Sequence, residues 1–165
     1  MNKKYIETFV AVFFLLIASA VTSFADSPKA SPAPDRTRFA TINLEKIIAA
    51  TRNPADNRKI ILRPTRPVFF SSKVKRLPEK RKIEYIYTAL RVAGGLDPMP
   101  EVSHRMFVES KGGSIIPVYV EDMAARKISR NLRVDQVVQF YAYHVYNYSK
   151  GPAFLVVDYE GEAGR

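Results

Sequence analysis

Arginine and lysine are concentrated in one short part of this sequence, residues 52–82. That segment holds eleven basic residues and only two acidic ones, whereas residues 83–165 are close to neutral. Guanidinium and ammonium groups neutralise phosphates or carboxylates and release counterions, so the segment predicts salt-sensitive binding of a polyanion. The candidate ligand-binding residues here are Arg63, Arg66, Lys73, Lys75, Arg76 and Arg81. Two alternatives stay open: a solvated surface that keeps the protein soluble, and a docking surface for an acidic protein.

An aromatic segment at 137–148, VVQFYAYHVYNY, supplies the second candidate. In a strand, alternate side chains point to opposite faces, which places Tyr141 and Tyr143 together on one of them. Tyrosines there could stack on bases or sugar rings if that face is open. The alternative is ordinary core packing and cross-strand pairing.

Catalytic and metal chemistry is poorly supported. His104 and His144 have no second ligand at a metal-binding spacing, and a chain without cysteine cannot form a cysteine zinc site or use a cysteine nucleophile. Ser149 lacks the GxSxG context of a nucleophile elbow. We therefore expect no catalytic residues, no metal, no cofactor and no enzymatic activity. An enzyme would instead need a pocket in which one of the histidines meets a carboxylate.

The N-terminus predicts export. Lys3 and Lys4 precede an unbroken apolar run, residues 9–21, and small residues at Ser23 and Ala25 suit cleavage after position 25. The run is shorter than the roughly 20 residues needed to span a bilayer. We expect a signal peptide over 1–25 and a periplasmic or secreted protein of the cell envelope. The alternative is an uncleaved segment, which would be the only membrane contact.

The remaining chain predicts one domain. Residues 26–38 are rich in proline and read as a disordered linker, residues 39–160 as a single domain, and residues 161–165 as a frayed tail. The expected elements are a helix at 42–50 capped by Asn43, an edge strand or two strand pieces at 60–70, a basic loop at 71–78, a helix at 78–92, a hairpin of 105–109 and 114–121, a short helix at 122–129, and a hairpin of 136–148 and 153–159.

The order of the later elements, hairpin, short helix, hairpin, resembles the last four strands of an OB-fold barrel. The resemblance covers roughly residues 105–159 and rests on element order, with no sequence motif behind it. The expected fold class is α+β, with a small, largely antiparallel sheet or a partly open OB-like barrel and one or two packed helices.

These observations predict a small, basic, exported binding module without enzymatic activity. Its basic segment would contact an anionic envelope polymer or surface, such as lipopolysaccharide, a wall polymer or nucleic acid. The alternative is an interaction subunit of an envelope protein complex that docks through the hairpin at 136–159. Salt should weaken the first kind of binding and have little effect on the second.

Overall fold

The computed structural model describes residues 35–52, 60–83, 85–148 and 151–161, which belong to one compact unit. The predicted signal peptide, residues 26–34 of the predicted linker and residues 162–165 of the predicted tail lie outside the described residues. In chain order the elements are η1 (Arg36–Arg38), β1 (Ala40–Thr41), α2 (Leu44–Thr51), β2 (Ile61–Lys80), α3 (Tyr85–Ala93), β3 (Val102–Glu109), β4 (Ile115–Glu121), α4 (Asp122–Asn131), β5 (Val137–Tyr148) and β6 (Gly151–Gly161).

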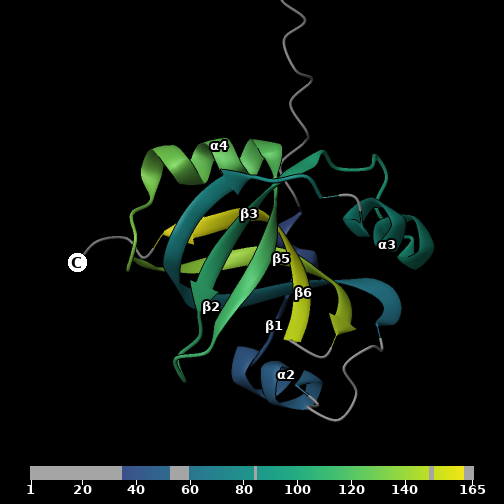
Figure 1. Ribbon diagram of the computed structural model, residues 1–165, viewed down its shortest axis with the longest axis horizontal. Helices are drawn as coiled ribbons and strands as arrows, with labels where there is room; N and C mark the ends of the chain where they lie inside the picture. The colour runs from purple at the N-terminus through teal and green to yellow at the C-terminus, as the bar shows by residue number, and fades with distance from the viewer. Residues whose placement is uncertain (1–34, 53–59, 84, 149–150, 162–165) are drawn as a thin grey trace, which may run out of the picture. The chain divides into compact units, whose positions relative to one another are not determined.

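Five of the described strands close into a barrel (Figure 1). The long strand β2 pairs with both β3 and β5, and β3–β4 and β5–β6 are antiparallel hairpins. A short parallel pairing between β4 and β6 completes the circle β2-β3-β4-β6-β5. This pairing order, with α4 between β4 and β5, is that of an OB-like barrel. It confirms the expected α+β class and the resemblance drawn from element order, and β1 adds a short parallel strand to β2.

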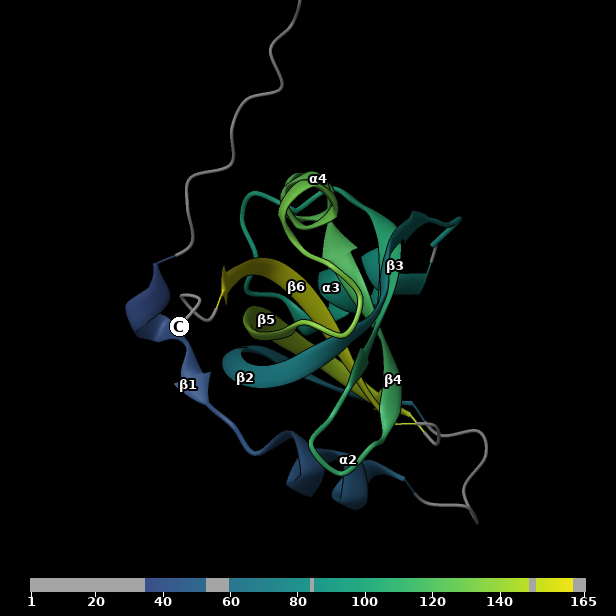
Figure 2. The ribbon, with the colours of Figure 1, turned by 90° about the vertical axis from the view of Figure 1, so that its left-hand side faces the viewer.

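The helices cover different parts of the barrel. In both views α4 lies at one end and α2 at the other (Figures 1 and 2). The α2 helix begins as predicted, because the Asn43 side chain accepts a hydrogen bond from the Lys46 N–H at 3.1 Å, and it buries Leu44 and Ile48. The α3 helix packs Ile86 and other apolar residues outside the barrel, against a second cluster formed largely by β5 and β6. A helix therefore lies at each end of the barrel, and α3 covers part of its outer wall.

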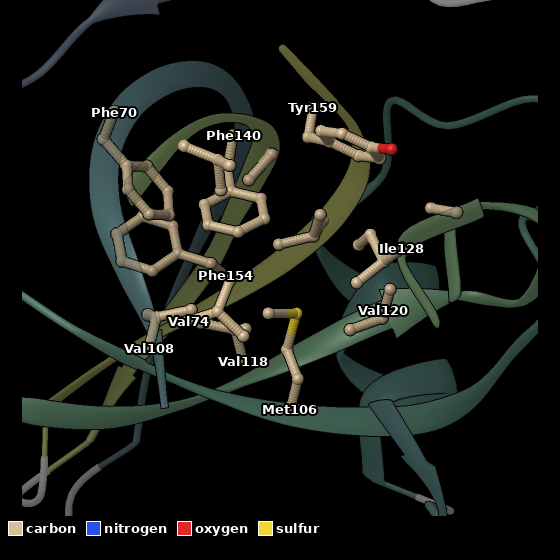
Figure 3. Packing of buried hydrophobic residues seen from close by; sticks show 14 of the residues in the cluster. Phe70, Val74, Met106, Val108, Val118, Val120, Ile128, Phe140, Phe154 and Tyr159 are labelled. Carbon is tan, nitrogen blue, oxygen red and sulfur yellow. The ribbon is translucent and has the colours of Figure 1, made fainter. Parts of the chain in front are cut away.

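Apolar side chains fill the barrel interior (Figure 3). Phe154 is fully buried, with its ring centroid 5.0 Å from that of Phe70, and the ring centroid of Phe140 lies 6.1 Å from that of Phe70. Met106 fills the space beside them, and Ile128 reaches in from α4. A small barrel packed in this way is filled by its own side chains and leaves no room for a ligand among them.

The course of β2 differs from the prediction. The predicted loop at 71–78 and the predicted helix start at Pro78 are wrong, because the strand continues to Lys80 and the helix begins at Tyr85. Ser72 and Val74 are buried while Lys73 and Lys75 point outward, which is the two-residue period of a strand. Sequence reasoning took these basic residues as a sign of a loop and overlooked the alternation.

The edge-strand interpretation of 60–70 is also wrong from Val68 onward, where β2 has partners on both sides. The prolines are tolerated for a physical reason. Pro64 lies in the irregular stretch between Leu62 and Arg66, and Pro78 lies in another between Arg76 and Glu79. Proline has no N–H for a ladder hydrogen bond, so these two are accommodated where regular pairing lapses, whereas Pro67 is the register partner of Tyr143 just before β2 gains β1 as a second partner.

The described residues of the predicted linker, 35–38, form a defined turn. Residues 36–38 form the turn η1, in which the Asp35 carboxylate accepts a hydrogen bond from the Thr37 N–H at 3.1 Å. Arg36 donates to Asp158 at 2.9 Å and to Glu160 at 2.7 Å, both on β6. Local proline content does not reveal these ion pairs, because their partners lie more than a hundred residues away.

Candidate functional site

The outer surface of β2 and β3 carries the largest group of predicted cations. The strand register places Lys73 opposite Glu109, Arg76 opposite Phe107, and Glu79 opposite Arg105. The neighbours Val74, Met106 and Val108 are buried in the barrel, so the alternate residues point outward. We call this surface the basic face. It comprises Lys73, Lys75, Arg76, Glu79, Arg81, Arg105, Phe107 and Glu109.

Phe107 lies at the centre of the basic face between two arginines. The guanidinium carbon of Arg76 is 5.0 Å from the Phe107 ring centroid, and that of Arg105 is 5.3 Å away. Both distances are in the cation–π range. The Nε of Arg105 is buried and has no hydrogen-bond partner among the described residues. The centre therefore combines a half-buried ring with two guanidinium groups beside it, and the buried Nε of Arg105 is not accessible to a ligand.

Three carboxylates moderate the charge of the basic face. Glu79 accepts from Arg81 at 3.0 Å, and this bond holds the pKa of Glu79 below its usual value. Lys75 lies 2.9 Å from Asp135, which raises the pKa of Lys75, and 3.6 Å from Glu109. Five cations thus face three carboxylates, with two positive charges in excess. Exposed ion pairs contribute only about 0–1 kcal/mol each, so an incoming anion can replace these carboxylates.

The structure separates the other predicted residues from the basic face. Arg66 lies at the opposite end of β2, near α2, and the side chain of Arg63 lies outside the described part of the chain. Tyr141 is buried, and the ring centroid of Phe39 lies 5.3 Å from its ring and 5.5 Å from that of Tyr143. The open face required for stacking on Tyr141 is thus absent, because the chain before β1 covers it.

Arg105 and Phe107 are site residues that sequence reasoning missed. Arg105, Phe107 and Glu109 alternate with the apolar Met106 and Val108, and that alternation already marks one solvent-facing row. The sequence could not show that the row would lie beside Arg76, because that depends on the pairing of β2 with β3.

A group of tyrosines continues the basic face toward β5. Arg105 is the register partner of Tyr119, whose hydroxyl lies 2.6 Å from that of Tyr146. Burial, together with this hydrogen bond, raises the pKa of Tyr146. A shallow cavity of about 60 Å³ lies here, lined by residues that include Arg105, Tyr119 and Tyr148. The face therefore offers further polar rings beside Phe107.

One histidine meets a carboxylate, the contact that an enzyme would need. His104 Nδ1 lies 2.9 Å from Asp122 Oδ1, but Ser103 Oγ also donates to Asp122, at 2.8 Å. In a serine–histidine–aspartate triad the hydroxyl instead lies at the second ring nitrogen, Nε2. Burial opposes ionisation of Asp122, but the hydrogen bonds from His104 and Ser103 together outweigh it and hold the pKa of Asp122 below its usual value. The arrangement ties the start of α4 to β3 and does not activate Ser103.

No cluster of three or more histidine, aspartate or glutamate side chains suited to a metal ion occurs in the described ranges. None of the described helices combines the length and apolar character needed to cross a membrane.

Comparison with models of protein families, with curated proteins and with solved structures finds no match.

Proposed function

We propose that this protein is an exported, non-enzymatic module that binds an anionic polymer through the basic face. The observation that carries the proposal is the cluster of Arg76, Phe107 and Arg105 on the outside of a filled barrel. In OB folds the outer surface of the second and third barrel strands is where oligonucleotides and oligosaccharides bind; here those strands are β3 and β4, so the basic face shares only β3 with that surface and otherwise lies on β2. Because fold alone does not determine function, the side chains of the basic face carry the proposal.

The chemistry of the basic face favours a polymer that has both negative charge and rings. The cations neutralise phosphates, sulfates or carboxylates, and Phe107 offers a surface for a base or a sugar ring. Nucleic acid, lipopolysaccharide and acidic wall polymers all fit this description. Export is proposed from the basic and apolar pattern of residues 1–25, which suits any of these ligands in a cell envelope.

The alternative, docking of a protein through the hairpin at 136–159, has less support. Tyr141, Val145, Tyr146 and Leu155 on this hairpin are already buried, and β5 and β6 are part of the barrel wall. Little apolar surface on the hairpin therefore remains for a partner.

The test measures binding of labelled single-stranded DNA and heparin to the purified full chain at several salt concentrations. The double variant Arg76→Gln/Arg105→Gln should bind about 10–100-fold more weakly, because two charge-assisted contacts are lost. For single-stranded DNA the slope of log affinity against log salt should flatten by about 0.7 for each cation removed. Glu79→Gln should strengthen binding, because a competing carboxylate is removed from the basic face.

Arg130→Gln is the matched control, because Arg130 is an exposed cation on α4 with no described ion pair. It should leave affinity nearly unchanged. If the control weakens binding as much as the double variant, the interaction is general attraction to a basic protein and the proposal fails. Unchanged affinity of the double variant would equally refute it. Binding of a defined protein partner, insensitive to salt, would support the docking alternative.

A further inference from the structure

The row of paired side chains on β2 and β5 that faces the barrel interior changes from apolar to polar toward α2. Register partners on neighbouring strands point to the same face, and Phe70–Phe140 and Val68–Ala142 both lie in the apolar interior. The next pair in this row is Arg66–His144. Two polar side chains, an exposed arginine and a half-buried histidine, therefore follow the apolar pairs at this end of the barrel.

The end of the barrel beside this pair is hollow. A cavity of about 530 Å³ lies between α2 and the facing parts of β2 and β5. Lys46, Ile47, Ala50 and Thr51 line it from one side of α2, since residues three and four apart share a helix face. Mouths of β-barrels are common ligand sites, and this volume is within the roughly 300–1,000 Å³ of small-molecule pockets.

The cavity is lined by positive charge, without negative charge among its described residues. Lys46 and Arg66 both line it, neither has an ion pair among the described residues, and no carboxylate is among the described residues of its wall. His144 Nε2 lies 2.6 Å from Asn147 Oδ1, so both polar groups also face this region. Ile47 and Pro64 add apolar surface.

The geometry points to a binding site at the α2 end of the barrel for a small molecule that carries one anionic group, a phosphate ester or a carboxylate, on a compact apolar body. Lys46 and Arg66 bind the anion, and Ile47, Ala50 and Pro64 contact the apolar body. This site is separate from the basic face, because Arg66 and Arg76 lie toward opposite ends of β2. Polymer binding at one surface and small-anion binding at the other can therefore be tested independently.

The imidazole proton signals of the two histidines provide the test by NMR. The signals are assigned with a His144→Gln variant, and the purified full chain is titrated with phenyl phosphate, benzoate and neutral benzyl alcohol. Either anionic probe should shift the His144 signal saturably, with a Kd of about 1 mM or tighter, and leave the His104 signal in place. Which anion acts identifies phosphate or carboxylate as the preferred group.

Arg66→Gln and Lys46→Gln should each weaken this binding about tenfold, because each removes a charge-assisted contact. Arg91→Gln is the control, since Arg91 is an exposed cation on α3 that does not line the cavity. It should change nothing, and neither should Arg76→Gln/Arg105→Gln. Thermal melting of each variant confirms that it is folded. Equal binding of benzyl alcohol, a His144 signal unmoved by about 10 mM of either anion, or full affinity in the Arg66→Gln/Lys46→Gln variant would overturn the inference.

Discussion

Asp158 joins three parts of the fold through one buried carboxylate, and its replacement by asparagine tests that connection. Its Oδ1 lies 2.5 Å from Lys127 Nζ on α4, and its Oδ2 lies 2.9 Å from Arg36 Nη2 in η1. The Asp158 side chain is 10% exposed, whereas those of Arg36 and Lys127 are 48% and 46% exposed. Asparagine keeps the size of the side chain and removes its charge, so the variant isolates the electrostatic contribution.

The expected loss of stability follows from the contacts of Asp158 with Lys127 and Arg36. A hydrogen bond to a charged group contributes about 1.5–3 kcal/mol when it is well shielded. Because both cations are about half exposed, solvent reduces each contact to about 1 kcal/mol. We therefore expect Asp158→Asn to lower the free energy of unfolding by about 2 kcal/mol at neutral pH. In a domain of this size, that corresponds to a fall of roughly 6–8 °C in Tm.

The difference in free energy of unfolding between the unmodified protein and the Asp158→Asn variant should depend on pH. Burial opposes ionisation of Asp158, but the hydrogen bonds from Lys127 and Arg36 outweigh it and lower the pKa of the carboxyl. A carboxyl with a lowered folded-state pKa stabilises the protein above its unfolded-state pKa of about 3.9, and this contribution is lost as the pH falls through the folded value. The stability difference should be complete at pH 7 and shrink from about pH 4 downward.

Urea unfolding followed by circular dichroism, over a series of pH values, measures this difference. Glu101→Gln is the control, because Glu101 is exposed and has no described ion pair; it should change stability by less than about 0.5 kcal/mol. A loss below about 0.5 kcal/mol for Asp158→Asn at pH 7 would refute the reasoning. So would a loss that stays constant on acidification.

Two further predictions concern the core and the tyrosine cluster. Phe154→Ala should lower the free energy of unfolding by about 4 kcal/mol, because it leaves a cavity beside Phe70, whereas Val92→Ala at an exposed position should cost less than about 0.5 kcal/mol in the same urea assay. Burial and the hydrogen bond to Tyr119 raise the pKa of Tyr146, so the stability it contributes is complete below about pH 10 and is lost at higher pH. Tyr146→Phe should therefore reduce the alkaline loss of stability, measured by urea unfolding above and below pH 10; an unchanged loss would contradict this assignment.

Local patterns predicted those elements whose signals are local. Asn43 caps α2, and the glycines after Lys111 turn the β3–β4 hairpin, where Gly113 has a φ of +78° that suits glycine. The aromatic and β-branched content of β5 and the apolar run of β6 likewise identified both strands of the last hairpin. Each of these features depends on neighbours within a few residues along the chain.

The path of β2 was missed, because its one local signal, the alternation of Ser72, Lys73, Val74 and Lys75, is short. Its basic residues and prolines resemble a loop when they are considered alone. The strand forms because β3 and β5, both distant in sequence, supply hydrogen-bond partners and bury Val74. Tertiary pairing outweighed local propensity here.

The sequence by itself determined the concentration of positive charge, the alternation of strand residues and the order of elements that is typical of an OB-like barrel. Only the tertiary structure decided which of the basic residues lie together on the basic face and which line the cavity beside α2. Closure of the barrel places Arg76 against Phe107 and Arg105 on one surface, and it directs Arg66 with His144 toward the cavity beside α2. It also covers Tyr141 with Phe39. The physical reason is that register between distant strands decides which side chains become neighbours, and register depends on the packing of the whole barrel.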